Sequence, residues 1–132
     1  MIVVDASAVL ELLLKTTRAA GVADRVFDPR ESIHAPYLLD VEVAQVLRRF
    51  VRAETLVATR AGEALSDLEA LSIVRHAQLP MLRRIWALRD SVTACDAAYI
   101  ALAEALDAPL VKCDAKLTRA RGHGATVELV PA

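Results

Sequence analysis

Met1-Ile-Val-Val-Asp5-Ala-Ser7-Ala-Val-Leu, residues 1–10, joins an apolar run to an aspartate and then to a helical pattern. The run is short, apolar on both faces and rich in β-branched side chains, which predicts a buried central strand of a parallel sheet. The residues from Ser7 onward predict a helix, with Ser7 as its N-cap. Because ligands of open α/β sheets bind at the carboxyl ends of strands, the Asp5 carboxylate stands where it could act on a bound ligand. The alternative, that Asp5 merely caps the helix beside Ser7, stays open.

Length and composition favour one domain that spans residues 1–132. The mean hydropathy of +0.37 is high, yet charged residues interrupt the apolar runs, and none approaches the roughly 18 residues of a membrane span. The first residues lack the charged region of a signal peptide, so we expect a cytoplasmic protein. A formal net charge of -1 excludes a polybasic protein that wraps nucleic acid.

The two cysteines, Cys95 and Cys113, stand in neither a CxxC spacing nor a zinc-ligand spacing. We expect both to be reduced and buried, because free cysteine behaves as a small hydrophobic side chain. Each directly precedes an aspartate, which places both beside candidate functional residues.

Candidate strands alternate with candidate helices along the chain, which predicts a doubly wound α/β domain with a mainly parallel central sheet. Pro36 is expected in the first turn of the longest helix. The predicted strands are residues 1–4, 32–35, 72–77, 110–113 and 126–130, and the predicted helices begin at residue 7 and span 17–27, 36–54, 58–71, 80–89, 93–106 and 115–121.

Two further acids stand in informative places. Asp114 repeats the arrangement of Asp5, because a short apolar strand runs to it, and acids at neighbouring carboxyl ends of a parallel sheet face one crevice. Glu42 lies in the predicted long helix, on a face that also carries Leu47. A carboxylate on an apolar face is costly to bury without a partner. The alternative, in which Glu42 reaches water or Arg49 at the edge of that face, stays open.

Asp96 also lies on a largely apolar helical face, with Tyr99 as a neighbour one turn away. Thr93 and Asp96 form a pattern that is similar to a capping box at a helix N-terminus. A purely structural role is therefore open for Asp96. The two roles are compatible, because a helix N-terminus favours an ionised carboxylate.

Asp5, Glu42, Asp96 and Asp114 can converge at one point, two from strand ends and two from inward helix faces. Such carboxylates repel one another and need a cation to stay ionised. Oxygen ligands favour Mg²⁺ or Mn²⁺ over zinc, and an acidic Mg²⁺ pocket indicates phosphate chemistry. If repulsion dominates, the substitution Asp5→Asn is expected to leave the metal-free protein unchanged or more stable.

Four motifs in this order resemble the PIN-domain ribonucleases, in particular the VapC-type toxins of toxin–antitoxin modules, over essentially the whole chain. The matching segments are Ile2-Val-Val-Asp5-Ala-Ser7-Ala, Ala35-Pro36-Tyr-Leu-Leu-Asp-Val-Glu42-Val-Ala-Gln-Val-Leu-Arg48-Arg49, Thr93-Ala-Cys-Asp96-Ala-Ala-Tyr99-Ile-Ala-Leu-Ala and Pro109-Leu-Val-Lys-Cys-Asp114-Ala-Lys116-Leu. The resemblance implies a three-layer α/β/α PIN-like domain and a Mg²⁺-dependent endoribonuclease. It also implies the site residues, namely the metal-binding and catalytic acids Asp5, Glu42, Asp96 and Asp114 and the supporting hydroxyls of Ser7 and Thr93.

Two positions depart from the family pattern. Members often carry threonine where this chain has Lys112, and often an aromatic residue where it has Cys95. Lys112 either removes a hydroxyl from the pocket or adds a phosphate contact. Neither departure changes an acid, so the expected activity stands.

The resemblance further implies an RNA substrate, a cognate antitoxin that occludes the site, and a homodimer. We expect part of the surface of the first two helices, which carry the run Leu10 to Leu14 and the apolar residues Val22, Val26 and Phe27, to form a groove for an amphipathic antitoxin segment. The alternative, that these residues only pack the core, stays open. Two other functions stay open, a catalytically silent PIN-like binding module and a receiver-type phosphoacceptor domain. The lone Asp5 argues against a receiver, which needs an acidic pair there, and the four acids argue against a silent module.

Overall fold

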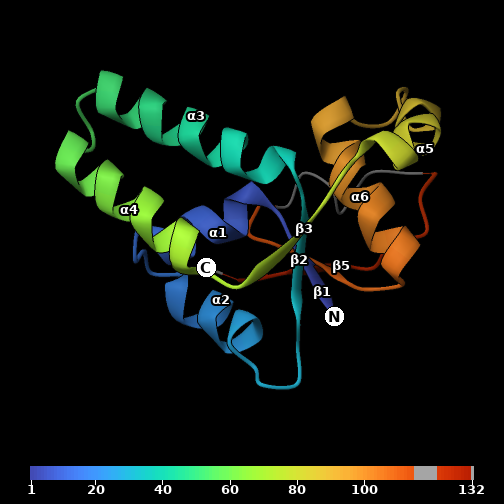
Figure 1. Ribbon diagram of the computed structural model, residues 1–132, viewed down its shortest axis with the longest axis horizontal. Coiled ribbons are helices and arrows are strands. Elements are labelled where there is room, and N and C mark those ends of the chain that lie inside the picture. Colours follow the sequence, from blue (N-terminus) through green and yellow to red (C-terminus); the bar gives the residue numbers. More distant parts are fainter. Residues whose placement is uncertain (115–121, 132) are drawn as a thin grey trace.

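A five-stranded parallel sheet forms the centre of the computed structural model, which describes residues 1–114 and 122–131 (Figure 1). The strand order is β3-β2-β1-β4-β5, and every pair of neighbours runs parallel. The strands are β1 (Ile2–Val4), β2 (Ile33–Pro36), β3 (Ile73–His76), β4 (Leu110–Lys112) and β5 (Val127–Leu129). The sequence prediction of a central, mainly parallel sheet is therefore confirmed.

β1 is the middle strand and lies between β2 and β4. Val3 pairs with His34 on one side and with Leu110 on the other. The three residues of β1 are at most 1% exposed, as expected for a strand covered on both faces. The aliphatic run at residues 2–4 therefore forms the centre of the core.

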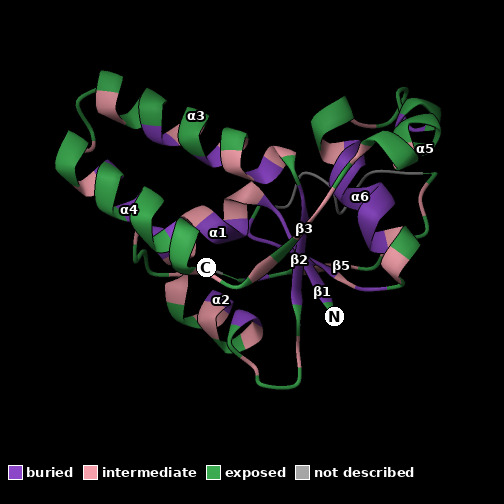
Figure 2. Ribbon diagram, in the orientation of Figure 1, coloured by how far each residue is buried: buried purple, intermediate pink, exposed green. Residues whose placement is uncertain are grey.

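Helices cover both faces of the sheet and give three layers, which Figure 1 shows with the sheet seen nearly edge-on. One layer contains α1 (Ala6–Leu13), α2 (Ala19–Val26), α3 (Leu38–Arg52) and α4 (Ala58–Ala70); the other contains the 3-10 turn η1 (Leu79–Met81), α5 (Leu82–Ala87) and α6 (Ala94–Leu106). Figure 2 shows that β1, β2 and β4 are buried, that β3 and β5 are only partly covered, and that the outer sides of α3, α4 and α5 are exposed. No helix in the described part of the chain is long and apolar enough to cross a membrane.

α6 packs directly on the sheet. Its residues from Ala97 to Ala103 are all buried, and four of these seven positions are alanine. The small side chains let the helix lie close to the sheet, while Tyr99 and Ile100 fill the space between them. The helix therefore fixes the position of every side chain in its first turns.

Three local predictions were wrong at their boundaries. Asp5, not Ser7, is the N-cap of α1. Pro36 ends β2 rather than opening α3. The helix expected at residues 80–89 is divided into η1 and α5, with Pro80 in the 3-10 turn. The helix expected at residues 115–121 lies outside the described residues.

The chain order reverses at β1. The chain passes from β1 outward to β2 and β3, and then crosses to β4 and β5 on the other side. In open α/β sheets, ligands bind at the carboxyl ends of the two strands that flank such a reversal. Asp5 follows β1 and Asp114 lies two residues after β4, so both acids lie at this end of the sheet, which we call the crevice.

Candidate active site

The Asp5 carboxylate is buried and accepts three hydrogen bonds. Its Oδ1 accepts from the Ser7 hydroxyl at 2.7 Å and from the backbone N–H of Ala8 at 3.1 Å. Its Oδ2 accepts from Lys112 Nζ at 2.9 Å. The N–H bond shows that Asp5 does cap α1. The capping role that the sequence left open for Asp5 is therefore real. Capping uses Oδ1, so Oδ2 can accept further contacts besides the one from Lys112.

Ser7 connects the two strand ends. Its hydroxyl donates to Asp5 and accepts a 3.1 Å hydrogen bond from the backbone N–H of Cys113. The contact joins the start of α1 to the loop that follows β4. Ser7 thus positions Asp5 relative to that loop.

Lys112 is the least expected residue of the crevice. Its side chain is 1% exposed, and its ammonium lies 2.9 Å from Asp5 Oδ2 and 3.7 Å from Asp114 Oδ2. Asp114 itself is exposed. The main interaction of Lys112 is therefore an ion pair with Asp5, which neither alternative given for the departure describes.

Glu42 approaches from α3 and is half-buried. The Tyr99 hydroxyl donates a 2.6 Å hydrogen bond to Glu42 Oε1. Burial raises the pKa of the Glu42 carboxyl; the Tyr99 hydrogen bond opposes this, and the negative charges of Asp96 and Asp5 raise it further. Glu42 therefore faces the other acids of the crevice, and its partner is Tyr99 rather than Arg49.

Asp96 lies in the first turn of α6, where Thr93 is the N-cap. The Thr93 hydroxyl accepts a 3.2 Å hydrogen bond from the backbone N–H of Asp96. This is the expected cap, and it fixes the first turn. Asp96 is half-buried and acts electrostatically on Glu42, so the helix presents it to the same crevice.

The acids of the crevice carry the type of ligand atom that a hard divalent cation prefers. Asp5, Glu42 and Asp96 offer carboxylate oxygens, which Mg²⁺ and Mn²⁺ prefer. The negative charges of Asp5 and Asp96 repel that of Glu42, and a nearby positive charge would reduce this repulsion. Within the described residues, no three histidine, cysteine or acidic side chains are grouped closely enough to hold a metal ion as they stand. Lys112 supplies the positive charge near Asp5.

Two sequence expectations about this region need correction. Both cysteines are free thiols, and Cys113 is buried as expected. Cys95 is exposed, because it lies before the buried part of α6, which begins at Ala97. The expectation that Asp5→Asn leaves the metal-free protein unaffected is also inconsistent with the structure. Asp5 has a buried ionic partner in Lys112, and the substitution would leave that ammonium unpaired.

Sequence reasoning did not identify Tyr99 as part of the site. Its hydroxyl is the one polar group on the otherwise apolar, alanine-rich run from Ala97 to Ala103. A single tyrosine in such a run, one turn after Asp96, is a signal that could have identified it, because buried tyrosine hydroxyls usually have a partner.

The sequence of the chain matches the family model described as the PIN domain over residues 2–122. The chain belongs to the PIN-domain family. Ribonuclease VapC12 of Mycobacterium tuberculosis is 39% identical over 130 residues, which cover 98% of this chain and 99% of that protein. Ribonuclease VapC1 of the same species is 40% identical over 130 residues, with 97% and 96% covered. This PIN-domain chain is therefore a relative of the VapC ribonucleases, as the motifs implied.

Solved structures show the same fold. VapBC2 from Rickettsia felis, bound to a DNA fragment from its promoter, matches with a TM-score of 0.70 at 12% identity and covers 98% of each chain. Mycobacterium tuberculosis VapC20, a toxin that cleaves the sarcin–ricin loop, matches with a TM-score of 0.68 at 13% identity and covers 89% of this chain and 93% of its own. These likenesses confirm the three-layer PIN-like architecture of this chain.

Proposed function

We propose that this PIN-domain protein is a Mg²⁺-dependent endoribonuclease toxin of a toxin–antitoxin module, and that Mn²⁺ can replace Mg²⁺. The observation that carries the proposal is the Glu42 carboxylate, half-buried at the crevice where Asp96 and Asp5 repel its charge. Membership of a ribonuclease family supports a phosphodiester as the substrate. The four acids, rather than a histidine or cysteine set, support a hard divalent ion.

In this proposal, Asp5, Glu42, Asp96 and Asp114 form the metal-binding and catalytic set, and Ser7 and Thr93 support it. A bound divalent ion supplies Lewis-acid activation of water and neutralises charge on the phosphate. Tyr99 keeps the Glu42 carboxylate oriented through its hydrogen bond.

The helix and strand ends fix the geometry of these acids before substrate arrives. Ser7 holds Asp5 at the end of β1, and Thr93 holds the first turn of α6, from which Asp96 projects. Such preorganisation lowers the cost of orienting groups during reaction. We therefore propose that the chain, as one PIN domain over residues 1–132, contains the whole reaction centre.

The test is cleavage of a structured RNA by the purified protein with Mg²⁺ or Mn²⁺. We expect internal cuts that stop when EDTA is added. Undiminished cleavage in EDTA would contradict the metal mechanism, whereas metal binding without cleavage of any RNA would favour the catalytically silent binding module.

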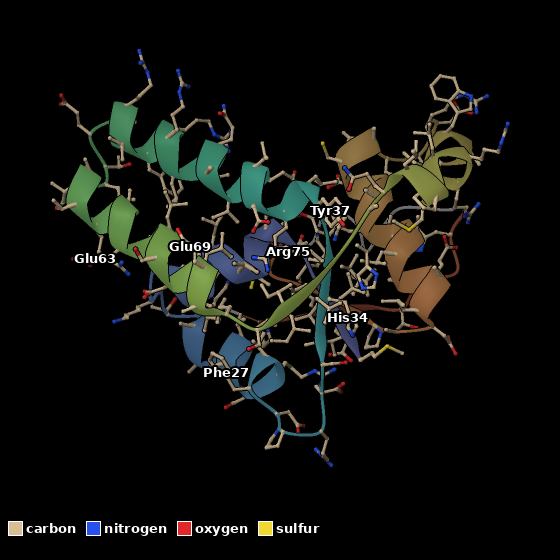
Figure 3. The ribbon with its side chains drawn as sticks, viewed as in Figure 1. Phe27, His34, Tyr37, Glu63, Glu69 and Arg75 are labelled. Carbon is tan, nitrogen blue, oxygen red and sulfur yellow. The ribbon has the colours of Figure 1, made fainter. Side chains whose placement is uncertain are left out.

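We also propose two protein partners in the cytoplasm. A cognate antitoxin would cover the crevice and contact the first two helices. Val22 and Val26 are buried there, so they belong to the core, whereas Phe27 is 58% exposed at the end of α2 and remains available (Figure 3). Amide-exchange protection by the antitoxin that omits residues 7–28 would contradict this placement.

The second partner is another copy of this chain. η1 and α5 expose three large apolar side chains, Leu79 (75%), Leu82 (55%) and Trp86 (67%), which line one shallow surface hollow together with Pro80 and Arg83. A contiguous apolar patch of this kind marks an interface more often than free surface. We propose that this face forms the homodimer contact.

A further inference from the structure

Lys112 places a fixed positive charge inside the acidic crevice. Lys112 is the last residue of β4. Its Nζ lies 2.9 Å from Oδ2 of Asp5, which follows β1, and 3.7 Å from Oδ2 of Asp114, which follows β4. The ammonium therefore lies between the two acids that end adjacent strands. It occupies the place where a cation shared by those two carboxylates would bind.

The ammonium is not free to leave this place. The Lys112 side chain is 1% exposed, and moving it away from Asp5 would leave an unpaired charge in the interior, which is strongly destabilising. Asp5 is equally constrained, because Ser7 and the Ala8 N–H both bond its other oxygen. The contact is therefore part of the folded core rather than a surface ion pair.

A Mg²⁺ ion that bridged Asp5 and Asp114 would need oxygens about 2.1 Å away. Lys112 Nζ already contacts the same two carboxylate oxygens, at 2.9 Å and 3.7 Å, so such an ion could bind there only if the ammonium moved away. Two-metal phosphodiesterase centres need their ions about 3.5–4 Å apart, both surrounded by carboxylates. In this chain, an ammonium rather than an ion contacts both Asp5 and Asp114.

We propose that Lys112 permanently replaces one divalent cation between Asp5 and Asp114, so that the centre binds a single ion on the side of Glu42 and Asp96. The inference rests on the proposed function, because it assumes that these acids bind a divalent ion. It assigns Lys112 a role that neither a lost hydroxyl nor a phosphate contact describes. A threonine at this position would leave the place open for a second ion.

The test counts the Mn²⁺ ions bound by the full chain, from the EPR signal of free aqueous Mn²⁺ during a titration. The proteins are the wild type, Lys112→Thr and Lys112→Met; the methionine retains the hydrocarbon volume if the threonine variant folds poorly. Arg30→Met is the matched control, because Arg30 is an exposed cation paired with Asp28 before β2, at the opposite edge of the sheet. All four are checked for cooperative melting.

We expect saturation at one Mn²⁺ per chain for the wild type and for Arg30→Met, and a twofold rise to two per chain for both Lys112 variants. The double variant Lys112→Thr/Asp114→Asn should return to one, because the second place then lacks an acid.

Two ions on the wild type, or one ion on both Lys112 variants, would overturn the role of Lys112 and leave the metal-dependent nuclease intact. If neither the wild type nor a Lys112 variant binds Mn²⁺, the proposed metal-dependent function itself fails and this inference fails with it.

Discussion

The Tyr99 hydroxyl donates a 2.6 Å hydrogen bond to Glu42 Oε1 across 57 residues of sequence. Tyr99 belongs to α6 and Glu42 to α3, so the bond joins the two helical layers beyond the carboxyl edge of the sheet. Burial raises the pKa of Glu42 above that of an ordinary glutamate, and the hydrogen bond from Tyr99 opposes this rise. The pair therefore affects how readily Glu42 ionises.

Tyr99→Phe removes the hydroxyl and keeps the ring that fills the core. Because the hydrogen bond lowers the Glu42 pKa, its loss should raise that pKa further. Glu42 must be ionised to bind a cation, so the acid limb of the pH–rate profile for RNA cleavage should move to higher pH. Stability should fall by about 1 kcal/mol for the lost hydrogen bond. An unchanged acid limb would show that Tyr99 only fills space.

Glu42→Gln tests the same carboxylate through the stability of the metal-free protein. The folded-state pKa of Glu42 is raised above its ordinary 4.5, so the stability that Glu42 contributes is fully present below that value and is lost as pH rises through the raised pKa. The wild type should therefore lose stability relative to Glu42→Gln as pH rises from acid to neutral. Denaturant melts of both proteins in EDTA measure the difference. A pH-independent difference would contradict the pKa direction.

Asp5→Asn should destabilise the metal-free protein. Asparagine caps a helix about as well as aspartate, so the loss comes from the unpaired Lys112 ammonium and should reach about 3 kcal/mol, a fall of roughly 10 °C in Tm. Asp67→Asn, at an exposed position on α4, is the matched control and should melt like the wild type. A wild-type Tm for Asp5→Asn would mean that the buried ion pair contributes nothing.

Trp86→Glu tests the proposed dimer face. The Arg89 guanidinium lies 4.8 Å from the centre of the Trp86 ring, and the ring is otherwise exposed beside Leu79 and Leu82. Light scattering after size-exclusion chromatography should report a dimer for the wild type and a monomer for Trp86→Glu. Phe27→Glu changes another exposed aromatic residue and should remain dimeric. If the Trp86→Glu variant remained a dimer, the proposal that this face forms the homodimer contact would be wrong.

The sequence predicted the parallel strands and the position of Asp5 directly after β1, because a short apolar run that ends in an aspartate is typical of a buried strand in an α/β chain. It could not predict that Lys112 pairs with Asp5, since that contact depends on β4 lying beside β1, 107 residues away in sequence. The Tyr99–Glu42 bond likewise depends on two helices from opposite layers meeting at one edge. Ser7 was taken as the cap of α1 because Asp5 and Ser7 are both good capping residues, and only the backbone geometry distinguishes them.

We propose that the acids of the crevice perform catalysis on RNA. The most direct measurement compares RNA cleavage by the wild type, Glu42→Gln and Glu69→Gln at equal concentration and saturating Mg²⁺. Glu69 lies on α4 and is exposed (Figure 3), so its variant removes the same charge outside the crevice. We expect Glu69→Gln to cleave like the wild type and Glu42→Gln to lose about 100-fold or more, since even the supporting partners of metal ligands are worth 10–100-fold. Equal cleavage by Glu42→Gln and the wild type would contradict catalysis by the acids of the crevice.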